Sequence, residues 1–203
     1  TTEIYTLSLH DALPISNTPF RKYKTRTHQG GIATPLIAHW PAGMKTESGG
    51  AGANGRLVHQ PAHIIDLLPT LLDVTGASYP TSHRGQSPLP LEGRSLKPLF
   101  ASPSLPLSTP PSSAPRLLAW EHEGHKALRQ GDWKVVAPNR GAWELYDLAR
   151  DPTETRDLAA QHPDRVRELS ALWRQWADRC GVLEYSELVA RRQSRGKQKQ
   201  KKQ

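Results

Sequence analysis

The sequence is most informative in what it lacks. Among 203 residues there is one cysteine, Cys180, which excludes an internal disulfide and any metal site built from several cysteines. No apolar run approaches the roughly 18 residues that a membrane-spanning helix requires. Apolar content is only 36%, and eighteen prolines and fifteen glycines indicate a loop-rich chain. None of these features identifies the compartment, so localisation stays open.

Acidic residues are also scarce, with 19 Asp or Glu against 27 Lys or Arg and a net charge of +8. Residues 191–203 alone carry seven Lys or Arg and no acid, so the remainder has a net charge of +1. We therefore predict a basic, disordered tail over residues 186–203. Such a tail could bind polyanions non-specifically. We expect no specific nucleic-acid partner.

The first residues do not resemble natural protein sequence. Residues 1–15, TTEIYTLSLHDALPI, can be encoded by codons that reproduce a sequencing-library adapter oligonucleotide, with the Ser16 codon beginning on its last base. We predict that residues 1–16 are adapter-derived and non-native, and leave them out of the fold. The natural sequence then begins at Asn17.

Two ordered blocks are predicted, separated by a Pro/Ser-rich linker or loop over residues 101–115. In the first block, residues 17–100, the run GGIATPLIAHWP (30–41) is typical of a short buried strand interrupted by Pro35. A helix is expected around HIIDLLPTLLDVTG (63–76), in which Pro69 introduces a kink or starts a second helix and Gly76 ends it.

The second block, residues 116–185, has the pattern of a small α+β unit. Four short strand candidates (116–122, 125–130, 132–138 and 142–148) are separated by turn residues, and a helix follows from Pro163. Along DWKVVA, Trp133 and Val135 alternate with Lys134 and Val136, which predicts a sheet covered on one face. The helix carries an apolar stripe to cover it: Val166, Leu169, Leu172, Trp173 and Trp176.

Several stretches stand in an order typical of one known enzyme family. Lys24 stands five residues before Gln29-Gly30-Gly31, and Trp40-Pro41 follow. Downstream, DLLPTLLDVTG, LEGRSLKPLF, LRQGDWKVV and WELYDLARDPTETRDLA are similar to the family's later elements. Together these stretches resemble the type I, formylglycine-dependent sulfatases of the alkaline phosphatase superfamily. The resemblance covers residues 17–185 and is closest to the arylsulfatases. It implies an α/β fold: the C-terminal part of the sulfatase α/β domain plus an α+β subdomain with a four-stranded antiparallel sheet and a C-terminal helix.

The resemblance implies hydrolysis of a sulfate ester on a small molecule or glycan. Of the family's catalytic parts, only Lys24 is matched here, as the lysine that contacts the sulfate and leaving-group oxygens. The Cys/Ser-x-Pro-Ser-Arg motif that yields formylglycine is absent from the sequence, and so are the aspartates that hold Ca²⁺. We therefore expect neither cofactor site in this chain, no activity from it alone, and a C-terminal portion of a longer enzyme.

Three alternatives remain open at this stage: a phosphate or phosphonate ester hydrolase of the same superfamily, a non-catalytic protein that binds polyanions through its basic tail, and a degenerate relative without a nucleophile. The histidines do not decide among them. His28 could line the pocket beside Lys24, whereas His59 and His63 are expected at the surface or as caps. EHEGH (121–125) alternates like a strand and turn, which separates successive side chains and argues against a metal site.

Overall fold

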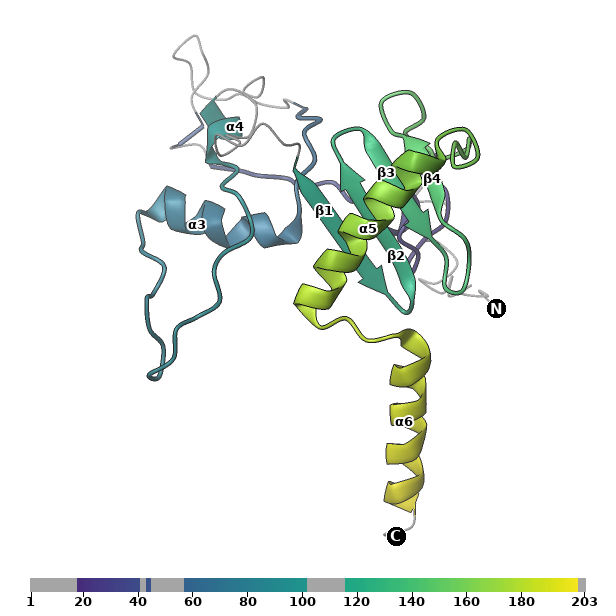
Figure 1. Cartoon of the computed structure of the whole chain (residues 1–203). Coiled ribbons are helices and arrows are strands. Elements are labelled where there is room, and N and C mark those ends of the chain that lie inside the picture. The colour runs from purple at the N-terminus through teal and green to yellow at the C-terminus, as the bar shows by residue number, and fades with distance from the viewer. Residues whose placement is uncertain (1–17, 41–42, 45–56, 102–115, 201–203) are drawn as a thin grey trace, which may run out of the picture. The chain divides into compact units, whose positions relative to one another are not determined.

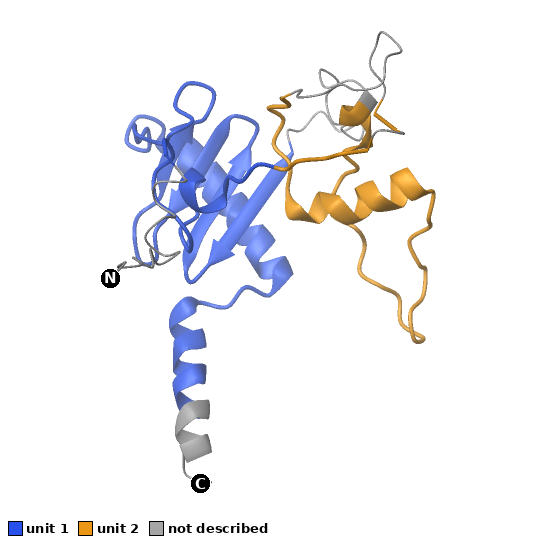
Figure 2. Cartoon of the chain, turned by 180° about the vertical axis from the view of Figure 1, so that it is seen from behind, with its two compact units in different colours: residues 1–35, 115–203 blue, residues 36–114 orange. Residues whose placement is uncertain are grey.

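The computed structural model describes residues 18–40, 43–44, 57–101 and 116–200 (Figure 1). These residues belong to two compact units (Figure 2): residues 1–35 and 115–203 form unit 1, and residues 36–114 form unit 2. The units divide the chain differently from the predicted domain boundaries, because residues 18–35 group with the C-terminal part. The predicted adapter segment, and all but the first residue of the predicted linker, lie outside the described residues.

Unit 1 is built on a four-stranded antiparallel sheet, as the sequence predicted. The strands are β1 (Leu117–His122), β2 (His125–Gln130), β3 (Trp133–Ala137) and β4 (Glu144–Asp147), paired in the order β1-β2-β3-β4. Glu123 (φ 51°) and Gly124 (φ 81°) connect β1 to β2. Positive φ at both central residues suits a two-residue hairpin whose twist matches that of the strands.

Helix α5 (Pro163–Cys180) crosses one face of the sheet (Figure 1). It begins with a proline, whose missing N–H would have had no partner there, and it ends at Gly181, which has φ 66°. The predicted stripe is confirmed: Leu169 and Trp173 are buried, and the other three members pack against the same core. This core also contains Leu128, Val135, Leu145 and Ala177. No helix in the described part of the chain is both long and apolar enough to cross a membrane.

The opposite face of the sheet is also covered, so the prediction of a sheet covered on one face was wrong. Ala127, Val136, Tyr146 and Leu148 form a second buried cluster there. Lys134, which alternates with the α5-facing residues as predicted, is completely buried. The covering comes from residues 18–32, which include the short helix α2 (Gln29–Ile32) and bond to β2, β3 and β4. Alternation along a strand separates its two faces but does not show what packs on each.

Unit 2 contains the 3-10 helix η1 (Ile64–Asp66), helix α3 (Leu67–Thr75) and helix α4 (Lys97–Ala101). Pro69 lies in the first turn of α3, where its missing N–H costs no helical bond, and Gly76 (φ 73°) ends the helix as predicted. His63 caps η1 by accepting from the N–H of Ile65, and His59 is exposed; both match their predicted roles. Buried Asp66 accepts from the backbone N–H of Arg94 at 2.8 Å, which attaches the LEGRSL segment to the helix.

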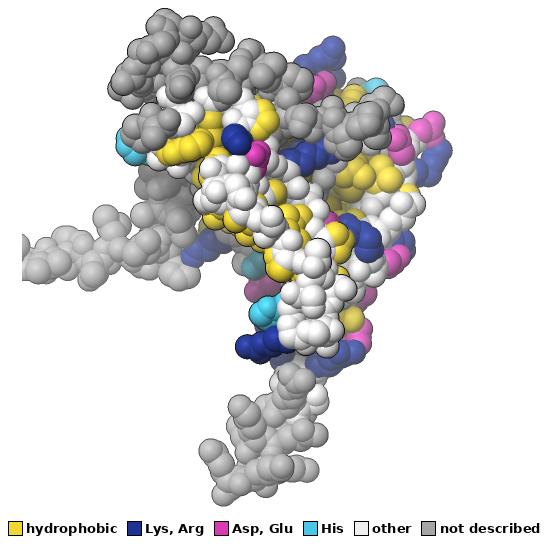
Figure 3. Space-filling model, turned by 90° about the vertical axis from the view of Figure 1, so that its left-hand side faces the viewer, with side chains coloured by type: hydrophobic (Ala, Val, Ile, Leu, Met, Phe, Trp, Pro, Cys, Tyr) yellow, Lys and Arg dark blue, Asp and Glu magenta, His cyan; other side chains and the backbone are white. Residues whose placement is uncertain are grey.

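The strand predicted over residues 30–41 does not form. Residues 29–32 are helical, residues 33–40 have no regular secondary structure, and Leu36 and Ile37 are 56% and 89% exposed. A buried strand needs neighbours to pair with, and unit 2 has no regular strand among its described residues. Hydrophobic side chains, yellow in Figure 3, lie at the surface of the described residues. The most exposed of the large hydrophobic side chains are Leu36, Ile37, Leu57, Ile64, Leu71 and Leu89.

Where the sequence predicted a disordered tail, the chain forms helix α6 (Tyr185–Gln200). Its Ala, Arg, Lys, Gln and Glu residues are all good helix formers. Glu187 and Arg191, four residues apart, form an ion pair at 2.6 Å, in the orientation that supports a helix. The composition of this segment indicates that it has too few apolar residues to pack into a hydrophobic core, but it does not exclude a local helix.

Candidate functional site

The predicted site residue, Lys24, lies on the loop formed by residues 21–28, which we call the Lys24 loop. A turn closes beside it through a hydrogen bond from the N–H of Arg26 to the carbonyl oxygen of Tyr23 at 3.3 Å. Lys22 (φ 64°) and Lys24 (φ 50°) both have left-handed backbone conformations. Non-glycine residues adopt this region at a cost, and they persist there only when the surroundings impose it. The Lys24 loop therefore has an imposed conformation.

Gly30 and Gly31 allow that conformation by close approach, one of the two reasons anticipated from the sequence. A Cβ on Gly30 would lie 2.1 Å from the carbonyl oxygen of Lys22, and one on Gly31 would lie 1.9 Å from that of Arg26. These obstacles are backbone atoms, so no side-chain rotation could relieve the overlap. The N–H of Gly30 donates to the carbonyl oxygen of Arg21 at 3.0 Å, which closes the loop on the first turn of α2. Only glycine fits here without moving the loop.

A network of buried polar groups attaches the Lys24 loop to the sheet. At its centre the Nζ of Lys134 lies 2.7 Å from Oε1 of Glu154, and both side chains are fully buried. Gln29 joins this pair twice: its N–H donates to Oε2 of Glu154 at 2.6 Å, and its Oε1 accepts from Lys134 at 3.0 Å. Burial lowers the pKa of Lys134 to about 8, although the Glu154 carboxylate opposes that shift. A pKa of about 8 favours the Lys134 ammonium at pH 7.

A second chain of contacts joins the loop to β4. Arg21 donates from Nη1 to the hydroxyl of Tyr146 at 3.1 Å and also to the carbonyl oxygen of Glu154. The Tyr146 hydroxyl donates to Oε2 of Glu144 at 2.7 Å, and Nε2 of His28 lies 2.8 Å from the same oxygen. His28 is 2% exposed, so it serves this buried chain rather than the open surface. Burial, helped by Glu144, raises the pKa of Tyr146, which keeps its hydroxyl a donor.

The free energy of unfolding at acidic pH should depend on Glu144. Chiefly the hydrogen bond with His28 lowers the pKa of Glu144, with Tyr146 adding to the shift and burial opposing it. A lowered carboxyl pKa stabilises the fold fully above its unfolded value near 4.5, and that contribution is lost as pH falls through the folded value. Glu144→Gln should therefore weaken the dependence of unfolding free energy on pH below about 4.5. Urea unfolding between pH 6 and pH 3 measures this, and exposed Glu168→Gln serves as the control. Equal slopes in wild type and E144Q would contradict the assignment.

Arg26 lies beside the start of β2. Its Nη1 is 2.8 Å from Nε2 of His125, whose Nδ1 accepts from the N–H of Asn139 at 3.0 Å. Burial, and then the positive charge of Arg26, lowers the pKa of His125, which favours the neutral imidazole. The Lys24 loop thus carries four basic residues: Arg21, Lys22, Lys24 and Arg26. An arrangement of this kind is suited to an anionic ligand.

None of these groups forms a metal site. Among the residues that the structure describes, no three His, Cys, Asp or Glu side chains are grouped so as to hold an ion. The only cysteine in the sequence, Cys180, is exposed at the end of α5 and does not belong to a Cys/Ser-x-Pro-Ser-Arg motif. The side chains that the structure describes therefore fit neither Ca²⁺ nor formylglycine.

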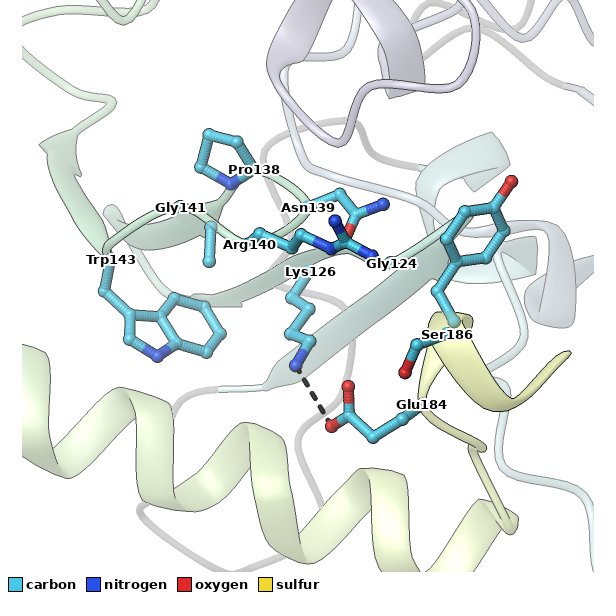
Figure 4. Close-up of a pocket in the computed structure, with 11 residues that line it drawn as sticks. Gly124, Lys126, Pro138, Asn139, Arg140, Gly141, Trp143, Glu184 and Ser186 are labelled. Atoms are coloured by element: carbon cyan, nitrogen blue, oxygen red, sulfur yellow. Dashed lines mark hydrogen bonds and ion pairs between the residues drawn. The ribbon is translucent and has the colours of Figure 1, made fainter. Parts of the chain in front are cut away.

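A hollow of about 160 Å³ lies on the α5 side of the sheet, around Lys126, Trp143 and Tyr185 (Figure 4). The Nζ of Lys126 lies 3.4 Å from Oε1 of Glu184 and 5.1 Å from the centroid of the Trp173 ring. Lys24 and the residues of the buried network are not among those that line it. Strand alternation places Lys126 with Leu128 on the α5 side and His125 with Ala127 on the side that the Lys24 loop covers.

The sequence singled out Lys24 but missed Lys134, Glu144, Tyr146 and Glu154, which hold its loop. One signal was available: Lys134 alternates with α5-facing residues between apolar neighbours in a central strand, where a lysine needs a buried partner. The partner itself could not be identified, since Glu154 follows β4 in an irregular turn.

Comparison with known proteins points to one family. A family model described as Sulfatase matches residues 4–77, a range that begins inside the predicted adapter segment. An uncharacterized sulfatase of Schizosaccharomyces pombe is 28% identical over 170 residues, which is 81% of this chain and 28% of that protein. Arylsulfatase K of Xenopus laevis is 28% identical over 178 residues, or 83% of this chain and 30% of that protein. The chain thus spans less than a third of these relatives.

A solved structure supports the fold. The crystal structure of Ps i-CgsB superposes with a TM-score of 0.58 at 22% sequence identity, covering 79% of this chain and 32% of that one. At that identity the likeness concerns the fold alone. It agrees with the α/β class, the four-stranded antiparallel sheet and the C-terminal helix that the sequence predicted.

Proposed function

From the premise that this chain is part of a sulfatase-family protein, we propose that the whole protein hydrolyses a sulfate ester, and that Lys24 contacts the substrate. The observation that supports this most directly is the Lys24 loop itself. Lys24, to which the motif resemblance assigns the substrate contact, has a left-handed conformation on a loop held by buried charges.

An ammonium group suits this role chemically. In the transition state of sulfate transfer, negative charge spreads over the sulfate oxygens and the leaving oxygen, so a fixed cation beside them lowers the barrier. Lysine provides a compact positive charge and three hydrogen-bond donors. Because the surrounding structure already imposes the loop conformation, less reorganisation is required when the substrate binds. Arg26, two residues further along, adds positive charge on the same loop.

The test begins with the gene. Sequencing outward across residues 16 and 17 tests whether a longer reading frame exists, and if it does, the protein it encodes would be produced together with a formylglycine-generating enzyme. Lys24→Ala should lower kcat/KM for an aryl sulfate by roughly 10²–10³-fold, the usual cost of losing one donor to a developing oxyanion. Lys22→Ala is the matched control, because it removes a lysine from the same loop at another left-handed position. It should remain within a few-fold of wild type.

Two results would refute this proposal. K24A could match K22A in activity, or the protein could hydrolyse an aryl phosphate or phosphonate faster than the sulfate. The second result would favour the related hydrolase class that the sequence left open. The polyanion-binding alternative is tested separately, by salt-dependent heparin binding with and without residues 191–203.

A further inference from the structure

Both ends of the Lys24 loop are attached to one buried residue. At the start of the loop, Arg21 donates from Nη1 to the carbonyl oxygen of Glu154. Just after its end, the N–H of Gln29 donates to the carboxylate of Glu154 at 2.6 Å. Lys24 lies between these two attachments, three residues after Arg21 and five before Gln29. Moving Glu154 would therefore shift both attachments together.

Glu154 is itself held in a defined position. It has a left-handed backbone conformation, with φ 57°, and its side chain is fully buried. The turn around it is organised by the carboxylate of Asp151, which accepts from the backbone N–H groups of Thr155 and Arg156, each at 2.8 Å. The hydroxyls of Thr153 and Thr155 also donate to Asp151, at 3.1 and 3.0 Å. This turn presents the Glu154 carboxylate in one orientation.

The Lys134–Glu154 pair is poorly explained by stability alone. Removing two charges from water costs several kcal/mol, and replacing a buried ion pair by well-packed apolar residues is often neutral or stabilising. Each charge here also bonds to Gln29: Glu154 accepts from its backbone, and Lys134 donates to its side chain. The pair therefore forms specific hydrogen bonds to the loop that an apolar pair of the same size could not form.

We propose that Glu154 and Lys134 are positioning residues that fix the Lys24 loop, and through it Lys24, in the conformation needed to meet an anionic substrate. As far as the substrate is concerned, this inference rests on the proposed sulfatase function. The fixing of the loop does not, and it can be measured without any activity.

The first experiment uses the 203-residue chain and hydrogen–deuterium exchange of its backbone amides. The double variant Lys134→Met/Glu154→Leu removes the bonds to Gln29 without leaving an unpaired buried charge. We expect its thermal midpoint to equal or exceed that of wild type. Exchange over residues 21–32 should rise by about tenfold or more, because two hydrogen bonds to charged groups are lost, while β2 and β3 should change by less than about twofold. The control removes the exposed pair of α6, Glu187→Leu/Arg191→Met, and should leave residues 21–32 unchanged.

Two outcomes would overturn the proposal: an unchanged exchange rate over residues 21–32 in the folded double variant, or an equal rise over the loop and strands β2 and β3. The latter would show a purely structural role. The second experiment uses the longer enzyme, where Lys134→Met/Glu154→Leu should lower kcat more than it raises KM. Adding Lys24→Ala to it should cause little further loss. If exchange over residues 21–32 rises as expected but the K24A variant stays active, Glu154 and Lys134 do position the loop and the proposed role of Lys24 is wrong.

Discussion

Lys134→Met alone is expected to lower the free energy of unfolding by about 3–5 kcal/mol at pH 7, the usual cost of breaking a buried ion pair from one side. The substitution leaves the carboxylate of Glu154, which is fully buried, without its cation. Of the donors described above, only the N–H of Gln29 would still bond to the Glu154 carboxylate. Urea unfolding followed by circular dichroism measures the loss.

The matched control is Lys97→Met, which removes a lysine from an ion pair with Asp73 in which both side chains are more than 40% exposed. Solvent screening makes such pairs worth about 0–1 kcal/mol, so this variant should differ little from wild type. Equal losses of unfolding free energy in K134M and K97M would mean that the Lys134–Glu154 pair is hydrated or uncharged in solution. The proposal that this pair fixes the Lys24 loop would then lose its physical basis.

Trp173→Ala should be comparably damaging, at about 3–5 kcal/mol. Trp173 is 6% exposed and lies at the centre of the core between α5 and the sheet. Its Nε1 donates to the carbonyl oxygen of Trp120 at 3.0 Å, and its ring lies 5.8 Å from that of Trp143 and 6.2 Å from that of Trp176, measured between centroids. The truncation would leave a cavity and remove the hydrogen bond to the Trp120 carbonyl oxygen.

Gln175→Ala, two positions further along the same helix, is the control for Trp173→Ala. Gln175 is exposed, so its loss should change the unfolding free energy by no more than about 0.5 kcal/mol. Chemical denaturation under identical conditions compares the two variants. A loss below about 1 kcal/mol for W173A would show that α5 is not anchored on the sheet through this residue.

Patterns of near neighbours accounted for much of the fold. The hairpin at Gly124, the start of α5 at Pro163 and the end of α3 at Gly76 each depend on residues only a few positions apart, so a reader of the sequence can locate them. The stripe on α5 is equally local, since the 3.6-residue repeat brings its members to one side. The Lys24 assignment came from the resemblance to the sulfatases, and its catalytic role stays a prediction.

The failures share a different cause. Residues 33–40 have strand-like composition, but a strand forms only where another strand accepts its hydrogen bonds, and that partner is not a property of the segment. The second covered face of the sheet was missed for the same reason: residues 18–32, about a hundred positions before β3, supply the cover. Helix α6 lies where the sequence predicted a disordered tail, and it needs only local helix propensity.

The sequence by itself determined the four strands, helix α5, the resemblance to sulfatases and Lys24 as the residue to test, because each depends on local pattern or motif order. Only the tertiary structure decided how Lys24 is held. The network that joins Arg21 and Gln29 to Lys134 and Glu154 spans more than a hundred residues. Such contacts arise when folding removes these charges from water, where each must find a partner. No spacing within the sequence specifies which partner that will be.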